Sequence, residues 1–515
     1  MKKYDTIIIG AGNGGLACAC MLAKHGQKVL LLEQSHVPGG FATSFKRGRF
    51  EFELSLHELC TFGRDENHSG AVRQLFDYLG ISDKIEWIDI PEAFRLITSV
   101  NGEKLDAEMP FGIDEFCEKA DYYSPGCKKE MKRLFDLNEE IRLTLGKLGK
   151  TKNKIAQLAV LLKKGGLLHT AAYSVDEVLA KINMSEKAKT IFKAYWAYLC
   201  TDFGNLSFFH YLSMINSYVE LGAVVPVNRS QEMTNCLVDT FISNGGELWL
   251  NSKVVKINTE NTICKSVVLS DGTVIEADNF VCNCSPHIAY GQLIEQKDIP
   301  EFEIKKANAQ KFGGRGFCVF LGLNKSAEEL GLNNYSYFIF PDMDTEKQFK
   351  RMGHPETNDV QNTVCINAAY PSASPKGTCI LCMTTLFTSD YWGSVTSENY
   401  FKEKESFANH MIDVFEKATG TNIKDYIEEI EIATPETFAR FTGTPQGTIY
   451  GYLGQKWDGV MPRTMMANKN DGFENLWFAG GYGERMLGFS SALASGRDTA
   501  ARICRNAVVN GREIV

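Results

Sequence analysis

The sequence has no apolar run of about eighteen residues, the length that would suggest a membrane-spanning helix. The first predicted strand begins by Thr6, which leaves no room for a signal peptide before it. We therefore expect a cytoplasmic protein, and any contact with a membrane would be peripheral.

The sequence also lacks a surplus of positive charge, because its formal net charge is −8. This balance argues against nucleic acid as a partner. No spacing of cysteine and histidine resembles a zinc site, so no metal is expected. No second G-x-G-x-x-G motif is present, so no separate NAD domain is expected.

The fifteen cysteines are an odd number and lie mostly in apolar contexts. We expect them to be small core residues in a reducing compartment. Cys379 and Cys382 stand three residues apart in a predicted strand, where such positions point to opposite faces. Neither a metal site nor a redox disulfide is expected from this pair.

Residues 4–43 predict a complete strand–helix–strand unit, in a chain of 515 residues that is long enough for two or three domains. An apolar strand around Thr6–Ile9 runs into Gly10, Gly12 and Gly15, which form a G-x-G-x-x-G turn. A helix over 16–25 and a second strand over 28–32 follow, and the second strand ends at Glu33. This order is typical of a dinucleotide site, and a glycine-rich turn without a nucleotide is the alternative.

Each residue of this unit has a physical task in a dinucleotide site. Gly10 permits the tight turn, Gly12 lets a pyrophosphate approach the backbone, and Gly15 lets helix and strand pack closely. The carboxylate of Glu33 is placed to accept hydrogen bonds from the hydroxyls of an adenosine ribose.

A second glycine turn follows at Pro38-Gly39-Gly40, and Ala42 and Thr43 come directly after it. Together with the segment LEQ…PGG…SF…FE, this turn resembles the family of phytoene desaturases, carotenoid cis-trans isomerases and retinol saturase. The resemblance implies a non-covalently bound FAD, with the backbone amides of the Gly39-Gly40 turn facing the flavin side of the cofactor.

The resemblance extends to residues 220–285, 434–452 and 475–502. It implies that Val254 lies near the adenine and that Gly480, Gly488, Phe489 and Ser490 belong to a C-terminal flavin motif. There a helix N-terminus would stabilise negative charge on the reduced flavin. Relatives usually carry an acidic residue where this chain has Gly481, and Glu484 is the candidate to replace it.

The implied fold class is α/β, with an FAD-binding Rossmann-type domain of the two-dinucleotide-motif, amine-oxidase-like kind and an α+β substrate domain over the flavin. We expect the FAD-binding domain to be discontinuous, over 1–70, 220–290 and 455–515. Residues 71–219 would form a helical part of the substrate domain or a lipid-facing cap. Residues 291–454 would form a mixed sheet over the flavin.

Three residues are candidates for catalysis on the strength of the resemblance. His57 follows the strand pattern of residues 49–59, in a segment that lies beside the flavin in the family. It is either a polar group at the reacting end or a packing histidine. Arg440 and Tyr450 lie in the stretch 434–452, where they would bind a polar end of the substrate or brace the loop.

Two stretches bear on how a substrate reaches the site. Residues 127–168 hold eleven lysines and arginines against four acidic residues, among apolar positions at helical spacing. This surface is either a solvated helix pair or a peripheral contact for anionic lipid. The aromatic-rich segment 195–218 is either core or the wall of an apolar tunnel.

The leading hypothesis is therefore an FAD-dependent oxidoreductase or isomerase. It would act on carbon–carbon double bonds of a long hydrophobic molecule such as a polyene, retinoid or unsaturated lipid, by desaturation, saturation or isomerisation. The alternatives are an FAD-dependent amine oxidase, which predicts an aromatic cage at the flavin, and a non-enzymatic prenyl-binding or lipid-binding escort protein of the same fold. Neither the oligomeric state nor the electron donor or acceptor follows from the sequence.

Overall fold

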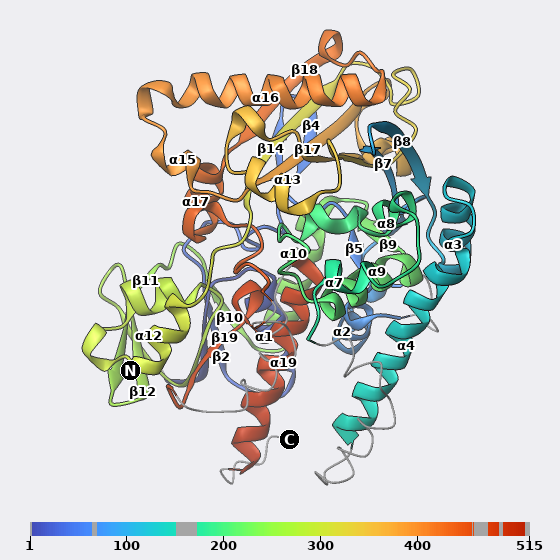
Figure 1. Cartoon of the computed structure of the whole chain (residues 1–515). Helices are drawn as coiled ribbons and strands as arrows, with labels where there is room; N and C mark the ends of the chain where they lie inside the picture. The colour runs from blue at the N-terminus through green and yellow to red at the C-terminus, as the bar shows by residue number, and fades with distance from the viewer. Residues whose placement is uncertain are drawn as a thin grey trace.

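The protein is described by a computed structural model that covers residues 3–63, 69–150, 172–455, 457, 472–483 and 488–509. It is built around two large sheets, each of seven strands. In Figure 1 one sheet and its helices occupy the lower half, where both termini lie, and the other sheet lies under a long helix at the top.

The first sheet has the strand order β10-β2-β1-β13-β12-β11, and β19 also pairs with β13. Its strands are β1 (Lys3–Ile9), β2 (Val29–Leu32), β10 (Glu247–Trp249), β11 (Val254–Glu260), β12 (Ile263–Leu269), β13 (Val274–Cys282) and β19 (Leu476–Phe478). The strands β10, β2, β1, β13 and β19 are parallel, whereas β12 and β11 are antiparallel additions. The carboxyl ends of the parallel strands therefore meet at one edge, where open α/β sheets bind ligands.

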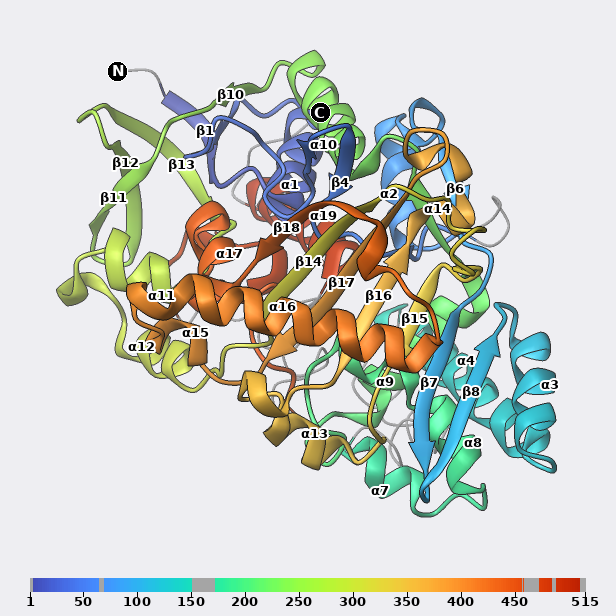
Figure 2. The same ribbon diagram turned by 90° about the horizontal axis from the view of Figure 1, so that it is seen from above.

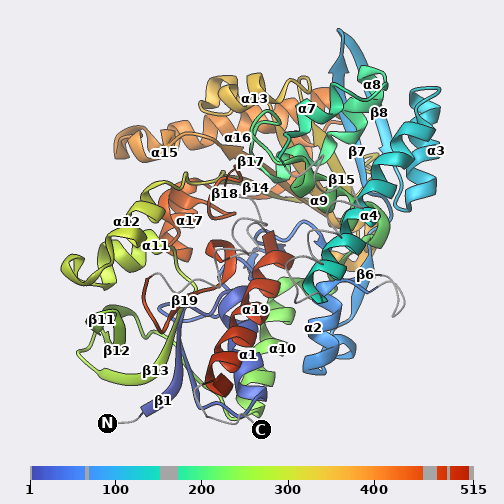
Figure 3. The same cartoon turned by 60° about the horizontal axis from the view of Figure 1, so that its bottom comes forward.

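Three helices cover one face of the first sheet, and Figure 3 shows them side by side. They are α1 (Asn13–Lys24), α10 (Arg229–Ser243) and α19 (Gly488–Val509). Alternation along β1 explains how both faces are filled, because Ile8 packs with these helices while Ile7 and Ile9 pack on the opposite side. Burial on both faces is typical of parallel strands that are rich in Ile, Leu and Val.

The second sheet has the order β18-β14-β17-β16-β15-β7-β8. Its strands are β7 (Phe94–Val100), β8 (Glu103–Met109), β14 (Arg315–Leu323), β15 (Ser336–Ile339), β16 (Gln361–Cys365), β17 (Cys379–Phe387) and β18 (Ile427–Ala433). Helix α16 (Ser397–Thr419) crosses its outer face, as Figure 2 shows. The sequence predicts a strand over 315–323 and a helix over 397–419, and the bounds of β14 and α16 coincide with these ranges.

The two faces of the second sheet belong to different cores. Phe317 and Val319 of β14 pack with the helix α16, whereas Cys318 and Phe320 point to the interior of the molecule. Cys379 and Cys382 of β17 are divided between the same two cores. The sequence-based expectation that they point to opposite faces is therefore confirmed.

Smaller elements fill the space between and beside the sheets. The hairpin β3 (Ser44–Arg47) and β4 (Phe50–Glu53) stands alone, and β5 (Leu59–Cys60), β9 (Ala223–Pro226) and β6 (Trp87–Asp89) form a three-stranded sheet. The helices on this side are α2 (Ala71–Leu79), α3 (Ile113–Tyr123), α4 (Lys128–Lys150), α7 (Val175–Leu179), α8 (Glu186–Phe192), η3 (Ala194–Tyr198) and α9 (Phe208–Leu221). Near the cavity described below lie α11 (Pro286–Ile288), η4 (Ala289–Leu293), α17 (Pro435–Thr442), η9 (Pro445–Gly447) and η11 (Gly480–Tyr482).

The expectation of a helical region from residue 71 onward is wrong for residues 87–109, which form β6, β7 and β8. The turn between β7 and β8 is Asn101-Gly102, and both residues have positive φ, at 52° and 86°. Asn-Gly in such a turn is a strong hairpin signal, because it matches the right-handed twist of the flanking strands. Strands β7 and β8 extend the second sheet, so the region 71–219 is mixed rather than helical.

The first sheet combines strands from the three segments that we expect to form the FAD-binding domain. The division of the chain into domains stays a prediction. Within the described ranges, no helix has both the length and the apolar character to cross a bilayer.

The basic residues of α4 are largely paired. Ion pairs join Lys128 to Glu118, Lys132 to Asp114, Arg133 to Glu130 and Arg142 to Glu139. These pairs neutralise much of the charge that would attract anionic lipid, and contact with a membrane stays a prediction. Residues 151–168 of the basic stretch lie outside the described residues.

Candidate active site and cofactor cavity

A cavity of about 1200 Å³ is lined by residues of both sheets. Its walls include Ile9 and Leu32 at the carboxyl ends of β1 and β2, and Phe320 of β14 from the other sheet. Such a volume is large enough for a cofactor together with a substrate, since pockets for one drug-sized ligand measure about 300–1,000 Å³.

The glycine turn after β1 forms one end of the cavity. Gly10 has φ +100°, a conformation that favours glycine. A Cβ on Gly15 would lie 2.0 Å from the Gly10 carbonyl oxygen, and one on Gly12 would lie 2.8 Å from Nδ2 of Asn283. Gly10 and Gly12 line the cavity, and Gly15 packs behind them, as each task assigned from the sequence requires.

Glu33 lies beside this turn at the end of β2 and lines the cavity. Its Oε2 accepts a hydrogen bond from the Ala11 N–H and its Oε1 accepts one from the Ser35 N–H, both at 2.8 Å. Each carboxylate oxygen can accept a second bond. Glu33 is therefore fixed in place and can still receive two hydroxyl groups from a ligand.

The second glycine turn is attached directly to the first. The Gly39 N–H donates to the Ala11 carbonyl at 2.8 Å, and Gly39 forms a parallel bridge with Gly12. Gly39 and Gly40 have φ of 118° and 60° and line the cavity together with Thr43. Ala42 is fully buried behind the wall, where its carbonyl accepts a hydrogen bond from the Thr234 hydroxyl at 2.7 Å.

The N-terminus of α19 closes the cavity on another side. Gly480, Gly488, Phe489 and Ser490 line it, as does Val254. The Ser490 hydroxyl donates to the Cys60 carbonyl at 2.7 Å, which ties this helix to the segment that carries His57. Glu484 lies outside the described residues, so its proposed role beside Gly481 stays a prediction.

These residues fit a dinucleotide such as FAD. The close contacts at Gly12 and Gly15 make a cradle that a Cβ would fill. The buried Oδ1 of Asn13, at the start of α1, has no hydrogen-bond partner among the residues that the structure describes, as expected beside a ligand. The helix N-termini of α1 and α19 bring positive partial charge to the cavity, which suits phosphate and reduced flavin.

His57 lines the cavity. Its Nε2 lies in hydrogen-bond contact with the Thr384 hydroxyl at 2.9 Å, and its backbone carbonyl accepts a bond from the Tyr335 hydroxyl at 2.5 Å. Burial lowers the pKa of His57 to about 4. The imidazole is therefore neutral at neutral pH.

Glu58 also lines the cavity, and the sequence pattern did not select it. The residue is only 6% exposed, and among the described residues neither carboxyl oxygen has a hydrogen-bond partner of normal geometry. Burial raises its pKa to about 8, with a smaller contribution from the like charge of Glu92, although contact with the Tyr198 hydroxyl acts in the opposite direction. The signal that could have identified Glu58 in the sequence is its place as an acidic residue at the end of a stretch of alternating apolar residues.

The other two catalytic candidates differ in position. Tyr450 lines the cavity, and burial raises its pKa above the ordinary value. Arg440 is exposed on α17 and is not part of the cavity wall, although Phe438 and Phe441 of the same helix are. The structure thus brings His57 and Tyr450 together and leaves Arg440 outside.

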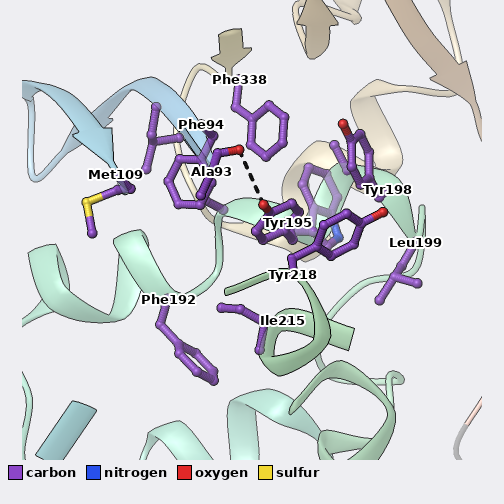
Figure 4. Packing of buried hydrophobic residues seen from close by; sticks show 14 of the residues in the cluster. Ala93, Phe94, Met109, Phe192, Tyr195, Tyr198, Leu199, Ile215, Tyr218 and Phe338 are labelled. Atoms are coloured by element: carbon purple, nitrogen blue, oxygen red, sulfur yellow. Dashed lines mark hydrogen bonds between the residues drawn. The ribbon is translucent and has the colours of Figure 1, made fainter. Parts of the chain in front are cut away.

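The aromatic segment 195–218 is divided between core and cavity. Figure 4 shows Tyr195 inside the core, where its hydroxyl donates to the Ala93 carbonyl at 3.3 Å and its ring contacts Phe94 and Phe338. Tyr198 and Tyr218 lie next to it but also line the cavity. The segment is therefore partly core and partly cavity wall, so each of the two sequence-based alternatives applies to part of it.

Comparison with known proteins agrees with this geometry. A family model described as "Flavin containing amine oxidoreductase" matches residues 14–504. All-trans-retinol 13,14-reductase of Danio rerio is 23% identical, with 99% of this chain and 86% of that protein covered. Chloroplastic prolycopene isomerase of Daucus carota is 25% identical, with 89% and 74% covered.

Among solved structures, putrescine oxidase has a TM-score of 0.64 at 14% identity, with 98% of this chain and 99% of that chain covered. At this identity the likeness shows the fold alone. The amine-oxidase-like α/β fold and the resemblance to retinol saturase and carotenoid isomerase are confirmed.

Proposed function

The chain belongs to the flavin-containing amine oxidoreductase family, and from that premise we propose that it acts on a carbon–carbon double bond of a long, apolar, unsaturated molecule. FAD is its cofactor, and its reaction class is that of an FAD-dependent oxidoreductase or isomerase. A polyene, a retinoid or an unsaturated lipid has the chemistry that fits, with saturation, desaturation or isomerisation as the reaction.

The observation that carries this proposal is the continuity of the cavity. One volume of about 1200 Å³ joins the dinucleotide cradle to walls that are mainly apolar. Those walls include Leu54, Leu56, Leu199, Phe320, Phe438 and Ile449. An extended hydrocarbon could lie along these walls with a double bond next to the cofactor, because apolar surface favours apolar ligands.

The residues of the chain have distinct tasks in such a reaction. Bound FAD supplies the exchange of a hydride with carbon. Gly10, Gly12 and Glu33 would hold the adenosine and pyrophosphate end, and the N-terminus of α19 would stabilise negative charge at the other end. The apolar walls exclude water and orient the double bond.

The names of the curated relatives support the same substrate class. One relative is named for the reduction of retinol and the other for the isomerisation of prolycopene, and both molecules are polyenes. The escort-protein alternative requires a lost flavin site, whereas the cradle at Gly12, Gly15 and Glu33 is intact here.

One observation favours a second candidate, oxidation of an amine. Tyr198, Tyr218 and Tyr450 line the cavity around Glu58, as an aromatic cage for an ammonium group would. A cage of this kind holds a cation best when the neighbouring carboxyl is ionised, whereas burial keeps Glu58 neutral at neutral pH. We therefore rank this function second.

Turnover of a defined panel of substrates distinguishes action on a double bond from oxidation of an amine. The flavin-loaded protein is incubated with all-trans-retinol, prolycopene, an unsaturated fatty acid and putrescine, with and without a chemical reductant, and the products are identified by mass spectrometry. We expect a polyene product that has gained or lost two hydrogen atoms or has changed geometry. Conversion of putrescine to an aldehyde, with every unsaturated compound unchanged, would overturn the proposal.

A further inference from the structure

Asn283 lies between the two glycine motifs of the cofactor site. It directly follows β13, the strand that pairs in parallel with β1 on one side and with β19 on the other. Strand β1 leads into the turn at Gly10, and β19 leads into Gly480. The Asn283 N–H donates to the Ile9 carbonyl at 2.9 Å, which fixes the residue at the carboxyl edge of the sheet.

The side chain of Asn283 occupies space that the neighbouring glycines leave open. A Cβ on Gly12 would lie 2.8 Å from Nδ2, and a Cβ on Gly14 would lie 2.8 Å from Oδ1. A Cβ on Gly480 would also clash with Oδ1. Glycine at these three positions therefore makes room for a carboxamide of the protein itself, in addition to the approach of a ligand.

The carboxamide of Asn283 is available to a ligand. The residue is half-buried and lines the cavity together with Gly12, Gly14 and Gly480. Among the residues that the structure describes, neither amide atom of Asn283 forms a hydrogen bond, and neither is fully buried. A side-chain amide has two N–H donors, which suit the oxygens of an anion.

The wall of the cavity offers little positive charge to a pyrophosphate. Within the described ranges, the lysine and arginine side chains that line it are Arg47 and Lys253. Arg47 is paired with Glu431 at 2.6 Å, and Lys253 stands next to Val254, on the side expected for adenine. The charge of a pyrophosphate in the glycine cradle would therefore be met by the backbone N–H groups at the N-terminus of α1 and by uncharged side-chain amides.

We propose that Asn283 binds the pyrophosphate of FAD, with its side-chain N–H₂ donating to a phosphate oxygen beside Gly12. The glycine motifs did not point to this residue, because a single asparagine after a strand has no characteristic spacing. The inference rests on FAD as the cofactor and holds whichever substrate the enzyme takes.

Binding of FAD to Asn283→Asp is the first test. Aspartate has the shape of asparagine, but its carboxylate has no donor and repels a pyrophosphate. FAD affinity, measured by equilibrium dialysis at neutral pH, should fall by about 10–100-fold, the loss typical of a hydrogen bond to a charged group. Relative to the wild type, the loss should shrink as the pH is lowered towards about 4, the ordinary pKa of aspartate, because the protonated carboxyl regains a donor.

Asn279→Asp is the matched control for this test. Asn279 lies on the same strand, β13, is half-buried like Asn283 and is not part of the cavity wall. This variant should bind FAD like the wild type. Wild-type affinity for FAD in Asn283→Asp as well would overturn the inference.

Ligands that carry part of FAD locate the contact. Asn283→Ala should weaken the binding of FAD and of ADP, which both contain a pyrophosphate, by about 10-fold or more. It should leave the affinity for adenosine unchanged, as measured by calorimetric titration of the apoprotein. Equal losses for FAD, ADP and adenosine would mean that the substitution distorts the whole cradle, and would overturn the assignment.

A crystal structure of the FAD-loaded wild-type protein decides the point even if the variants do not fold. We expect Nδ2 of Asn283 at about 2.7–3.2 Å from a phosphate oxygen, and a separation beyond about 3.5 Å would contradict the inference. None of these measurements uses a substrate. Their failure would leave the proposed action on a double bond standing, whereas conversion of putrescine alone by a protein that binds FAD through Asn283 would refute only the proposed function.

Discussion

At the scale of single residues, Glu58 couples the pH of the solution to the stability of the fold. Its pKa is about 8 in the folded protein and near 4.5 when the side chain is exposed. Between these values the folded state holds a proton that the unfolded state releases. The free energy of unfolding should therefore decrease by about 1.4 kcal/mol for each pH unit of rise through this window.

Glu58→Gln should remove this contribution. The variant should gain stability relative to the wild type as the pH rises from about 4.5 towards 8, as measured by urea unfolding. Glu295→Gln is the matched control, because Glu295 is an exposed carboxylate whose pKa the ion pairs with Lys256 and Lys297 lower to about 2. Parallel stability curves for wild type and Glu58→Gln would show that Glu58 is ionised in the folded protein.

Glu33 is the second residue with a direct prediction. In Glu33→Gln an amide N–H₂ would face one of the two backbone N–H groups that now donate to the carboxylate. The charge-assisted bonds to the ligand would be lost as well, at about 1.5–3 kcal/mol. FAD affinity, measured by equilibrium dialysis, should fall by about 10–100-fold, whereas Glu295→Gln should bind FAD like the wild type.

His57 and Glu58 show what sequence patterns can and cannot predict about a residue. The resemblance favours His57, because its segment lies beside the flavin in the family and an imidazole ordinarily titrates near neutrality. Burial changes the titration of both residues, since it lowers the pKa of His57 and raises that of Glu58. The degree of burial depends on Tyr198 and Tyr450, which are far away in the sequence.

At the scale of elements, the contact between α1 and α19 holds the two ends of the cofactor site together. A Cβ on Gly496 of α19 would lie 2.2 Å from the Gly14 carbonyl oxygen of α1, which is backbone and cannot rotate away. The two helices can therefore approach closely only because Gly496 has no side chain.

Gly496→Ala should push α19 away from α1. We expect a loss of about 1–3 kcal/mol in the free energy of unfolding, which is typical of overpacking, and weaker FAD binding. Gly291→Ala is the matched control, because a Cβ there meets no atom within 4 Å and Gly291 is not part of the cavity wall. Equal effects of the two substitutions on thermal unfolding would contradict this account of the helix contact.

Helices and strands with local sequence patterns were easier to predict than the roles of single residues. The strand–helix–strand unit, β14 and α16 follow from apolar periodicity and end signals. The hairpin β7–β8 was missed, although Asn101-Gly102 marks it, because its strands hold charged residues such as Arg95 and Asp106. These two side chains form an ion pair across the hairpin, which the alternation of apolar residues does not reveal.

At the scale of the whole molecule, the cavity is lined by residues of both seven-stranded sheets, so a cofactor bound there would contribute to the stability of the fold. Removing FAD would expose the glycine cradle and the apolar walls to water. The apoprotein should unfold at a lower temperature than the holoprotein, and added FAD should restore stability by about 2.7 kcal/mol at 100 times its dissociation constant. An unfolding temperature independent of FAD would contradict the assignment of the cavity.

The packing of one sheet against the other is the part that sequence reasoning alone could not supply. Gly10 and Gly488 can each be assigned to a flavin motif from local sequence, but their shared cavity depends on contacts between segments almost the whole chain apart. The identity of the substrate depends on the same cavity walls, which come from α9, β14 and α17.

The central claim is that this flavoprotein acts on carbon–carbon double bonds. Its most direct test is the absorbance of the flavin and of the polyene after rapid mixing without oxygen. We predict that all-trans-retinol or prolycopene either changes the redox state of the flavin or is itself isomerised, and that putrescine leaves the oxidised flavin unchanged. Reduction of the flavin by putrescine, with both polyenes inert towards the reduced protein, would contradict the account.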